Sequence, residues 1–275
     1  MSSLDEVLSR LGPNDTRSVL IGEGLPPSDL PTARRHEWGW SCEATDDPAP
    51  PMVDRGIIRG HLANAAPKLL VMDVDSTLTT SEAIDLLAEA AGAGEKVAEI
   101  TERAMRGELD FAESLAERVA TLRGLPVHVL DEVRRQIEFQ PGAVELVQAV
   151  KAAGARVGVV SGGFIEIVQP NVEAIGIDYA TANTLEVVDG FLTGRTVGEV
   201  IDRQAKARHL LSYCELASCT PDQAVAIGDG ANDLDMLAAA GLGIAYCAKL
   251  VTAAQADATI SFPRLDAALG YLLIG

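Results

Sequence analysis

The chain has 275 residues and a formal net charge of −18, from 40 acidic and 22 basic side chains, and 48% of its residues are hydrophobic. This length and composition fit one or two globular domains with a sizeable core. The acidic excess argues against a binder of nucleic acids or anionic membranes, because those ligands need a basic surface. It does not exclude an anionic small molecule, which a few local cations can bind.

The chain also lacks the usual signs of export, membrane insertion and thiol chemistry. Its apolar runs are well short of the ~20 residues that span a bilayer. Met1–Glu6 has neither the basic nor the apolar region of a signal peptide. The four cysteines form no C-x-x-C pair, and the four histidines show no metal-binding spacing. We therefore expect a cytoplasmic protein without zinc, dithiol or histidine chemistry.

Residues 1–66 differ in composition from the rest of the chain. They are rich in proline, contain both tryptophans and show little sustained periodicity. A short helix is compatible with Leu4–Leu11, and the proline-rich run at 46–51 predicts a linker or an exposed loop. The pattern is too weak to name a fold, so we treat residues 1–66 as an N-terminal extension of unknown fold.

From residue 68 onward, apolar runs typical of strands recur, and helical patterns separate several of them. This alternation predicts an α/β fold with an open, Rossmann-like parallel sheet covered by helices. In such sheets, ligands bind beyond the carboxyl ends of the strands. The predicted strands are Leu69–Val74, Arg156–Val160, Ala224–Ile227, Gly243–Tyr246 and Ala258–Phe262.

The first predicted strand ends in Asp73-Val74-Asp75-Ser76-Thr77, which presents two carboxylates at its tip. An Asp can attack a phosphoryl group covalently, and paired carboxylates can hold Mg²⁺. Most acidic pairs at strand ends are solvated loop residues, and for this pair alone that interpretation stays open. A calcium-binding loop fails, because Thr77, Leu78 and Ile84 stand at positions five, six and twelve of its template.

Residues 79–139 hold mostly helical patterns and no convincing strand, which predicts a helical cap inserted after the first core strand. Near its start, Thr79–Glu82 matches a capping box in which the Glu82 side chain bonds back to the Thr79 N–H. The alternative is that Glu82 receives an ammonium group of a substrate. The two uses compete unless Ser81 caps the helix.

Arg118 interrupts an apolar stripe, because it shares one helical face with Phe111, Leu115 and Leu122. Its guanidinium either extends out of the stripe into water or meets an anion under the cap. A carboxylate would suit it, since a guanidinium can hold a carboxylate with two parallel bonds. The residues alone leave this choice open.

Two later segments could bind phosphate. Ser161-Gly162-Gly163 offers a hydroxyl and backbone N–H groups before a helix, a combination that suits an anion but also fits an ordinary strand-to-helix turn. Lys206 begins a helical pattern and could contact phosphate as a point charge, although most lysines are solvated. Between them, Asp189-Gly190 separates two apolar runs and predicts a β-hairpin.

Gly228-Asp229-Gly230-Ala231-Asn232-Asp233 follows another predicted strand. Asp229 could supply a further carboxylate for a metal, and Asn232 and Asp233 could add oxygen ligands. The alternative is a helix start, with Asn232 or Asp233 capping residues 234–240. Asp73–Thr77, Ser161–Gly163 and Gly228–Asp233 are thus three polar segments that each follow a strand of one predicted sheet. Three such strand ends are much harder to attribute to coincidence than a single one.

Together these segments resemble the phosphoserine phosphatases of the haloacid dehalogenase superfamily. The resemblance spans residues 67–275 and implies a core of 67–78 and 140–275 with a helical cap at 79–139. The superfamily motifs specify phosphoryl transfer, and Met105, Phe111 and Arg118 at this spacing narrow the likeness to the phosphoserine branch. The residues that carry the resemblance are Asp73–Leu78, Glu82, Ala104–Phe111, Ser114–Val119, Val160–Phe164 and Gly228–Asp233.

The resemblance implies a role for each site residue. Asp73 would be the nucleophile, and Asp75 would protonate the leaving oxygen of serine and later activate water. Mg²⁺ would bind the carboxylates of Asp73 and Asp229 and the backbone carbonyl of Asp75, with Asp233 supporting these ligands. The substrate would be held by Ser161, Gly162, Lys206 and Asn232 at its phosphate, by Glu82 at its ammonium, by Arg118 at its carboxylate, and would be shielded by Met105 and Phe111.

The implied activity is the Mg²⁺-dependent hydrolysis of O-phospho-L-serine, the last step of L-serine synthesis. The alternatives are a phosphatase or phosphotransferase for another small phosphomonoester, or a non-catalytic protein that binds metal or an amino acid. A P-loop nucleotide-binding protein is excluded, because the chain has no G-x-x-x-x-G-K-[ST] motif. The expected partner is a small substrate rather than nucleic acid or membrane. A homodimer is compatible with the sequence, but no residue argues for it.

Overall fold

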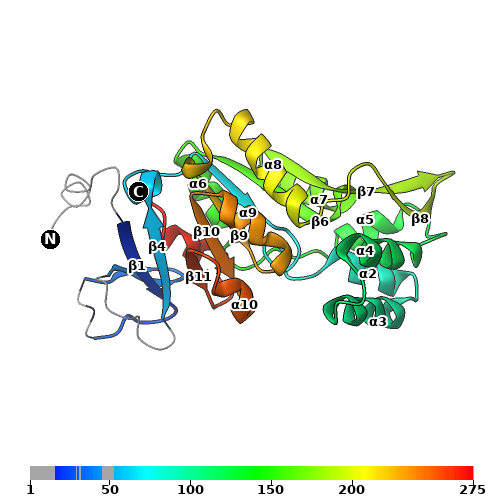
Figure 1. Ribbon diagram of the computed structural model, residues 1–275, viewed down its shortest axis with the longest axis horizontal. Helices are drawn as coiled ribbons and strands as arrows, with labels where there is room; N and C mark the ends of the chain where they lie inside the picture. Colours follow the sequence, from blue (N-terminus) through cyan, green and yellow to red (C-terminus); the bar gives the residue numbers. More distant parts are fainter. Residues whose placement is uncertain (1–15, 29, 31, 45–52, 275) are drawn as a thin grey trace.

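The computed structural model describes residues 16–28, 30, 32–44 and 53–274. Its strands form one 11-stranded sheet in the order β2-β3-β1-β4-β11-β10-β9-β5-β6-β7-β8 (Figure 1). The strands are β1 (Thr16–Gly22), β2 (Arg34–His36), β3 (Gly39–Glu43), β4 (Asp54–Arg59), β5 (Leu69–Met72), β6 (Arg156–Phe164), β7 (Tyr179–Val188), β8 (Phe191–Val197), β9 (Ala224–Gly228), β10 (Leu242–Tyr246) and β11 (Ala258–Ile260).

Helices follow most of the central strands. They are α2 (Ala83–Ala90), α3 (Gly94–Met105), α4 (Phe111–Ala120), α5 (Val129–Arg134), α6 (Ala143–Ala152), α7 (Ile165–Ala174), α8 (Arg203–Leu216), α9 (Leu234–Ala239) and α10 (Leu250–Ala253). Short 3-10 turns are η1 (Gly60–Ala63), η2 (Pro221–Gln223), η3 (Ala231–Asp233) and η4 (Leu265–Gly270). No helix in the described part of the chain combines the length and the apolar character that crossing a membrane requires.

The central strands, from β11 to β7 in sheet order, run parallel to one another. Side chains of a strand alternate between the two faces of a sheet. On β5, Leu70 and Met72 therefore pack with residues of α6 and α7, whereas Leu69 and Val71 pack with residues of α8 and α9. Burial on both faces explains the continuous apolar run of β5. The predicted α/β fold with a parallel sheet is confirmed.

All five predicted strands differ in their bounds from the observed ones, and the differences in β5 and β6 shape the site. β5 ends at Met72 because the chain turns at once: Ser76 has φ 60°, and the N–H groups of Leu78 and Thr79 both donate to the Val74 carbonyl. β6 continues to Phe164 instead of ending at Val160, but its pairing with β7 is interrupted between these two residues.

The N-terminal segment, for which the sequence predicted no fold, extends the central sheet. Its strands β1 to β4 pair antiparallel, and β4 joins β11 at Gly56. A Cβ on Gly56 would lie 2.7 Å from the Tyr271 ring, so glycine permits this close approach. Ile21 of β1 is buried in the same hydrophobic cluster as Leu70 of β5. The predicted helix at 4–11 and linker at 46–51 lie outside the described residues.

Helices α2 to α5 lie between β5 and α6 in the chain, at the opposite end of the molecule from the N-terminal strands (Figure 1). Their buried side chains, among them Leu87, Leu115 and Leu130, share one hydrophobic cluster with Phe164 of β6 and Leu192 of β8. The predicted hairpin is confirmed: β7 and β8 pair around Asp189 and Gly190, both with positive φ, as a type I′ turn requires.

Asp178 joins the end of the α7 segment to β6. Its carboxylate accepts from the Val157 N–H at 2.9 Å and pairs with Lys151 at 3.0 Å and Arg156 at 2.9 Å. Burial alone would raise the pKa of Asp178, but these three partners hold it below its usual value. The carboxylate therefore stabilises the fold only while it is ionised.

We expect Asp178→Asn to lower the free energy of unfolding at pH 7 by about 1 kcal/mol, since solvent screens the partly exposed cations. A lowered pKa in the folded state gives stability that is complete above the unfolded pKa and lost as the pH falls through the folded one. The difference in the free energy of unfolding between variant and wild type should therefore shrink below pH ~4. Urea unfolding at pH 7 and pH 3 measures it, and a difference independent of pH would contradict the assignment.

Candidate active site

The carboxyl ends of the parallel strands β5, β6 and β9 lie at one edge of the sheet. A cleft opens there, and side chains of α2 and α4 line its other side. The residues that line it come from segments far apart in the sequence, and most of the predicted site residues are among them. The lining consists of Asp73, Asp75, Glu82, Ile84, Phe111, Leu115, Arg118, Gly162, Gly163 and Asn232.

A buried ion-pair network forms the floor of the cleft. The Lys206 Nζ lies 2.7 Å from Asp73 Oδ2 and 2.6 Å from Asp233 Oδ1, and Lys206 and Asp233 are fully buried. Burial alone would lower the pKa of Lys206, but the carboxylates of Asp233 and Asp73 raise it above its usual value. Burial and the charge of Asp233 raise the pKa of Asp73, and Lys206 opposes this rise. Lys206 therefore stays charged and favours an ionised Asp73.

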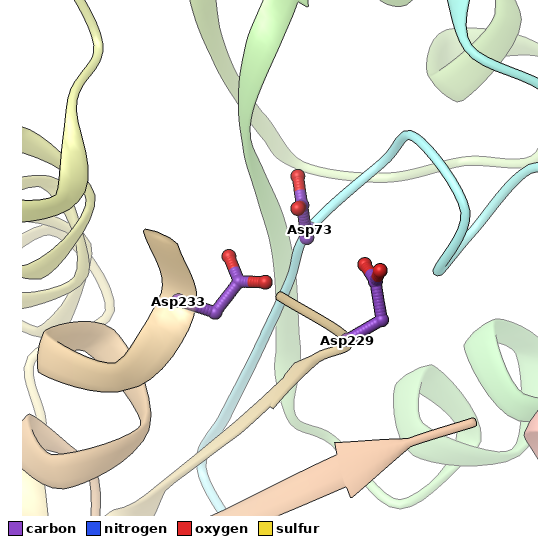
Figure 2. Close-up of side chains that lie close together, drawn as sticks. All are labelled: Asp73, Asp229 and Asp233. Atoms are coloured by element: carbon purple, nitrogen blue, oxygen red, sulfur yellow. The ribbon is translucent and has the colours of Figure 1, made fainter. Parts of the chain in front are cut away.

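Three carboxylates converge beside this lysine. Oxygen atoms of Asp73, Asp229 and Asp233 all lie within 4.8 Å of one another, and Figure 2 shows the side chains pointing toward a common space. The Thr77 hydroxyl donates to Asp229 Oδ1 at 2.9 Å and orients it. One ammonium offsets only part of this negative charge, so the donor set suits a metal cation.

Asp75 occupies a different environment two residues after Asp73. Its Oδ1 accepts from the Ala83 N–H at 3.0 Å, and its Oδ2 accepts from the Ser161 hydroxyl at 3.1 Å. Burial raises the pKa of Asp75, and these hydrogen bonds limit the rise. A raised pKa makes a carboxyl group bind its proton more readily than usual, which suits a group that exchanges a proton with a leaving group.

The structure excludes one of the two interpretations of Glu82. The capping box is wrong: the Thr79 hydroxyl donates to the Val74 carbonyl at 3.1 Å, and Glu82 makes no capping bond to α2. Asp75 instead accepts from the first turn of α2, through Ala83. The Glu82 side chain is thereby free to line the cleft, where partial burial raises its pKa.

Helix α4 carries three side chains to the cleft. A capping box between Asp110 and Glu113 starts this helix, with bonds of 2.8 and 2.9 Å. Phe111, Leu115 and Arg118 then share the face that lines the cleft. Among the described residues, the hydrogen bond found for the Arg118 guanidinium is a long one, 3.4 Å, to the Ser114 carbonyl. Its donors are therefore available to an anion in the cleft.

Two predicted site residues remain to be placed. Asn232 lines the cleft from η3. Met105 does not line it: this side chain ends α3 and is 71% exposed. Asp233 stands at the start of α9 but makes no side-chain bond to that helix; its carboxylate accepts from the Gly230 N–H at 2.9 Å, at the start of η3, and pairs with Lys206.

The sequence analysis did not single out two polar residues that hold the site together. Thr77 orients Asp229, and Asn183 on β7 donates to the Gly162 carbonyl at 2.8 Å. For Thr77 the signal was its place in the segment Asp73-Val74-Asp75-Ser76-Thr77, which follows the first predicted strand. For Asn183 it was the presence of an asparagine within a strand, where this residue is uncommon.

A parallel α/β sheet with an acidic, lysine-bridged cleft at its carboxyl edge defines a class of hydrolases. The chain belongs to the haloacid dehalogenase-like hydrolase family, whose model matches residues 70–238. The resemblance to this superfamily predicted from the motifs is confirmed.

Several proteins that are similar to this chain are named phosphoserine phosphatases. This chain is 51% identical over 221 residues to a phosphoserine phosphatase of Streptomyces coelicolor, covering 80% of this chain and 54% of that protein. It is 53% identical over 197 residues to the phosphoserine phosphatase of Streptococcus thermophilus, covering 72% and 92%. The chain thus spans about half the length of the Streptomyces coelicolor relative.

Among solved structures, it is similar to a phospho-aspartyl intermediate analogue of phosphoserine phosphatase. The TM-score is 0.71 and the sequence identity is 42%, over 75% of this chain and 99% of that one.

Proposed function

We propose that the chain hydrolyses O-phospho-L-serine to L-serine and phosphate, with Mg²⁺, as the last step of L-serine synthesis. The observation that carries this proposal is one cleft with Asp73 and Lys206 at its floor and Glu82 and Arg118 in its lining. Phosphoryl transfer depends on positioning and charge neutralisation, and the floor offers both. The names of the relatives support the choice of substrate.

The reaction would run in two steps through Asp73. Its carboxylate oxygen attacks phosphorus, the bond from phosphorus to the serine oxygen breaks, and Asp75 gives its proton to that oxygen. Asp75, now ionised, then takes a proton from water as the water attacks phosphorus. The aspartyl-phosphate is hydrolysed, and Asp73 is restored as phosphate leaves.

The other floor residues would hold the phosphate during both steps. The Lys206 ammonium, the Ser161 hydroxyl and the Gly162 N–H would bind phosphate oxygens, with Asn232 beside them. The carboxylates of Asp73 and Asp229 and the backbone carbonyl of Asp75 would hold Mg²⁺, with Asp233 supporting them. When bound, Mg²⁺ supplies positive charge that offsets the charge of the phosphate.

Glu82 and Arg118 would select the amino acid. A carboxylate and a guanidinium in one cleft match the ammonium and carboxylate of serine, and Phe111 adds an apolar wall. Met105, at 71% exposure, would shield the substrate only if α2 to α5 closed over the sheet as a cap. The chain enters and leaves this unit at one place, where Thr79 and Phe139 pair, and this supports such a movement.

Phosphate release from O-phospho-L-serine and a panel of other phosphomonoesters, with Mg²⁺ and with EDTA, tests the proposed function. We expect a strong preference for phosphoserine, and loss of activity with EDTA that added Mg²⁺ restores. Preferential turnover of other esters would be compatible with the proposed mechanism but would contradict the proposed substrate. Activity that EDTA leaves unchanged would contradict the proposed dependence on Mg²⁺.

Arg118→Met and Glu82→Gln should each raise the KM for phosphoserine by about 10–100-fold, since the first removes the charged donors for the substrate carboxylate and the second removes the negative charge that faces the substrate ammonium. Hydrolysis of p-nitrophenyl phosphate, which has neither group, should change little. Arg103→Met is a matched control, because Arg103 pairs with Glu117 at 2.7 Å and is not among the residues lining the cleft. Equal losses on both esters would contradict the selective role.

The same proposal includes a cytoplasmic location, consistent with the composition, and assembly as a homodimer. Sedimentation velocity of the purified chain tests the assembly, and a monomer at micromolar concentration would exclude the homodimer.

A further inference from the structure

Asn183 is a fully satisfied polar residue deep in the sheet. It lies on β7 with 1% of its surface exposed. Its Nδ2 donates to the Gly162 carbonyl at 2.8 Å, and its Oδ1 accepts from the Ile201 N–H at 2.9 Å. One side chain thus joins two backbone segments that come from different parts of the chain.

The first segment is the turn that would bind phosphate. β6 and β7 pair at Val160 with Thr181 and again at Phe164 with Asn183, so Ser161–Gly163 bulges out of the ladder. A bulge leaves backbone groups without ladder partners and redirects the strand. The Asn183 amide supplies a partner for the Gly162 carbonyl, and the Gly163 N–H donates to the Ser161 hydroxyl at 2.8 Å, so side-chain bonds fix the conformation of the bulge.

The second segment leads into α8. Ile201 precedes Asp202, whose carboxylate caps the helix by accepting from the Ala205 N–H at 2.7 Å. The Lys206 N–H donates to the Asp202 carbonyl at 3.0 Å, in the first turn of the helix. Lys206 reaches Asp73 from this turn, so the position of Ile201 bears directly on the position of the ammonium.

We propose that Asn183 is a positioning residue that holds the Ser161–Gly163 bulge and the start of α8 in one fixed relation, so that both meet the same phosphate. It does not line the cleft, so it acts through Gly162 and Lys206. An amide suits this place because it offers a donor and an acceptor side by side. The inference rests on the proposed function, because it assigns Asn183 to the phosphate end of that site.

Two variants separate the role from simple stabilisation. Asn183→Asp has nearly the same shape but replaces the donor to Gly162 by an acceptor. Asn183→Ser keeps a hydroxyl too short to bridge both segments. The matched control is Thr181→Val, two residues earlier on the same face of β7, where the Thr181 hydroxyl lies 2.6 Å from the Tyr213 hydroxyl.

The measurements are the affinity for inorganic phosphate by calorimetry with Mg²⁺, the kcat and KM for phosphoserine and p-nitrophenyl phosphate, and the Tm. We expect both Asn183 variants to bind phosphate at least about 10-fold more weakly and to lose about 100-fold in kcat/KM on both esters, because a small misplacement of binding groups is costly. Thr181→Val should stay within about threefold of wild type at a similar loss of Tm.

Wild-type phosphate affinity and kcat in folded Asn183→Asp, with only a lower Tm, would overturn the proposal. If Asn183→Ser does not fold, the near-isosteric Asn183→Asp decides alone. The phosphate measurement also separates this inference from the proposed function. A wild type that binds phosphate but hydrolyses no ester would contradict the proposed function, while weaker phosphate binding by Asn183→Asp would still support the positioning role.

Discussion

Replacing Asp73 by Asn should lower kcat for every phosphomonoester by about 10⁴–10⁶-fold, the scale seen when a nucleophile is removed. An amide is a poor nucleophile toward phosphorus, and the neighbouring carboxylates of Asp229 and Asp233 already accept from Thr77 and Lys206. Asp75 already accepts hydrogen bonds from Ala83 and Ser161 through its two oxygens, so it is held away from that task.

The fold should survive this substitution. Asn has the shape of Asp, and Lys206 keeps its partner Asp233 at 2.6 Å. Phosphate release and thermal unfolding measure the two effects, with Asp235→Asn as a control of equal charge change on the exposed Arg203 pair. After acid quenching, label from ³²P-phosphoserine should remain on wild type and be absent from Asp73→Asn. A variant that retains label or activity would contradict the assignment of the nucleophile.

Lys206→Met should be the most destabilising substitution in the site. The Nζ lies between Asp73 at 2.7 Å and Asp233 at 2.6 Å, and Lys206 is fully buried. Removing one partner of a buried ion pair leaves uncompensated charge and costs about 3–5 kcal/mol. The exposed Lys249 gives a control, since Lys249→Met changes the net charge equally without touching the carboxylates.

The destabilisation should depend on pH, with a sign that follows from the charges. Lys206 opposes the rise in the pKa of Asp73, so its removal raises that pKa further above the unfolded value. A carboxyl with a raised folded pKa is most destabilising when ionised, and stability recovers as the pH falls and it binds a proton. Urea unfolding at pH 8 and pH 5 should show a smaller difference at pH 5. An equal difference at both would contradict a charge-based cause.

The sequence alone determined the parallel sheet and the edge at which the site lies. Apolar runs such as Leu69–Met72 are long and unbroken because both faces of the central strands are buried, and this local pattern needs no knowledge of distant residues. Asp73, Ser161 and Asp229 directly follow or end such runs. Their meeting at one edge follows from the parallel arrangement itself. The resemblance then supplied roles that composition and spacing could not.

The antiparallel N-terminal strands escaped sequence analysis for a physical reason. β2 has 3 residues, all of them exposed, and β3 has only 5. Ile21 of β1 and Ile58 of β4 are buried in a cluster that includes residues from the C-terminal part of the chain. Gly56 illustrates this, because its need for a small residue arises from Tyr271, more than two hundred positions away. Local periodicity cannot report such a contact.

Only the tertiary structure decided the choices that depend on a partner from another segment. Thr79–Glu82 has the local form of a capping box, yet Ala83 donates to Asp75 and Glu82 lines the cleft. Arg118 lines the same cleft together with Phe111 and Leu115 of its own helix. The structural role of Asn183 depends on its hydrogen bonds to Gly162 and Ile201, which belong to two other segments. The sequence determines which groups are available, but hydrogen bonds and ion pairs between distant segments exist only once folding has brought both partners within reach.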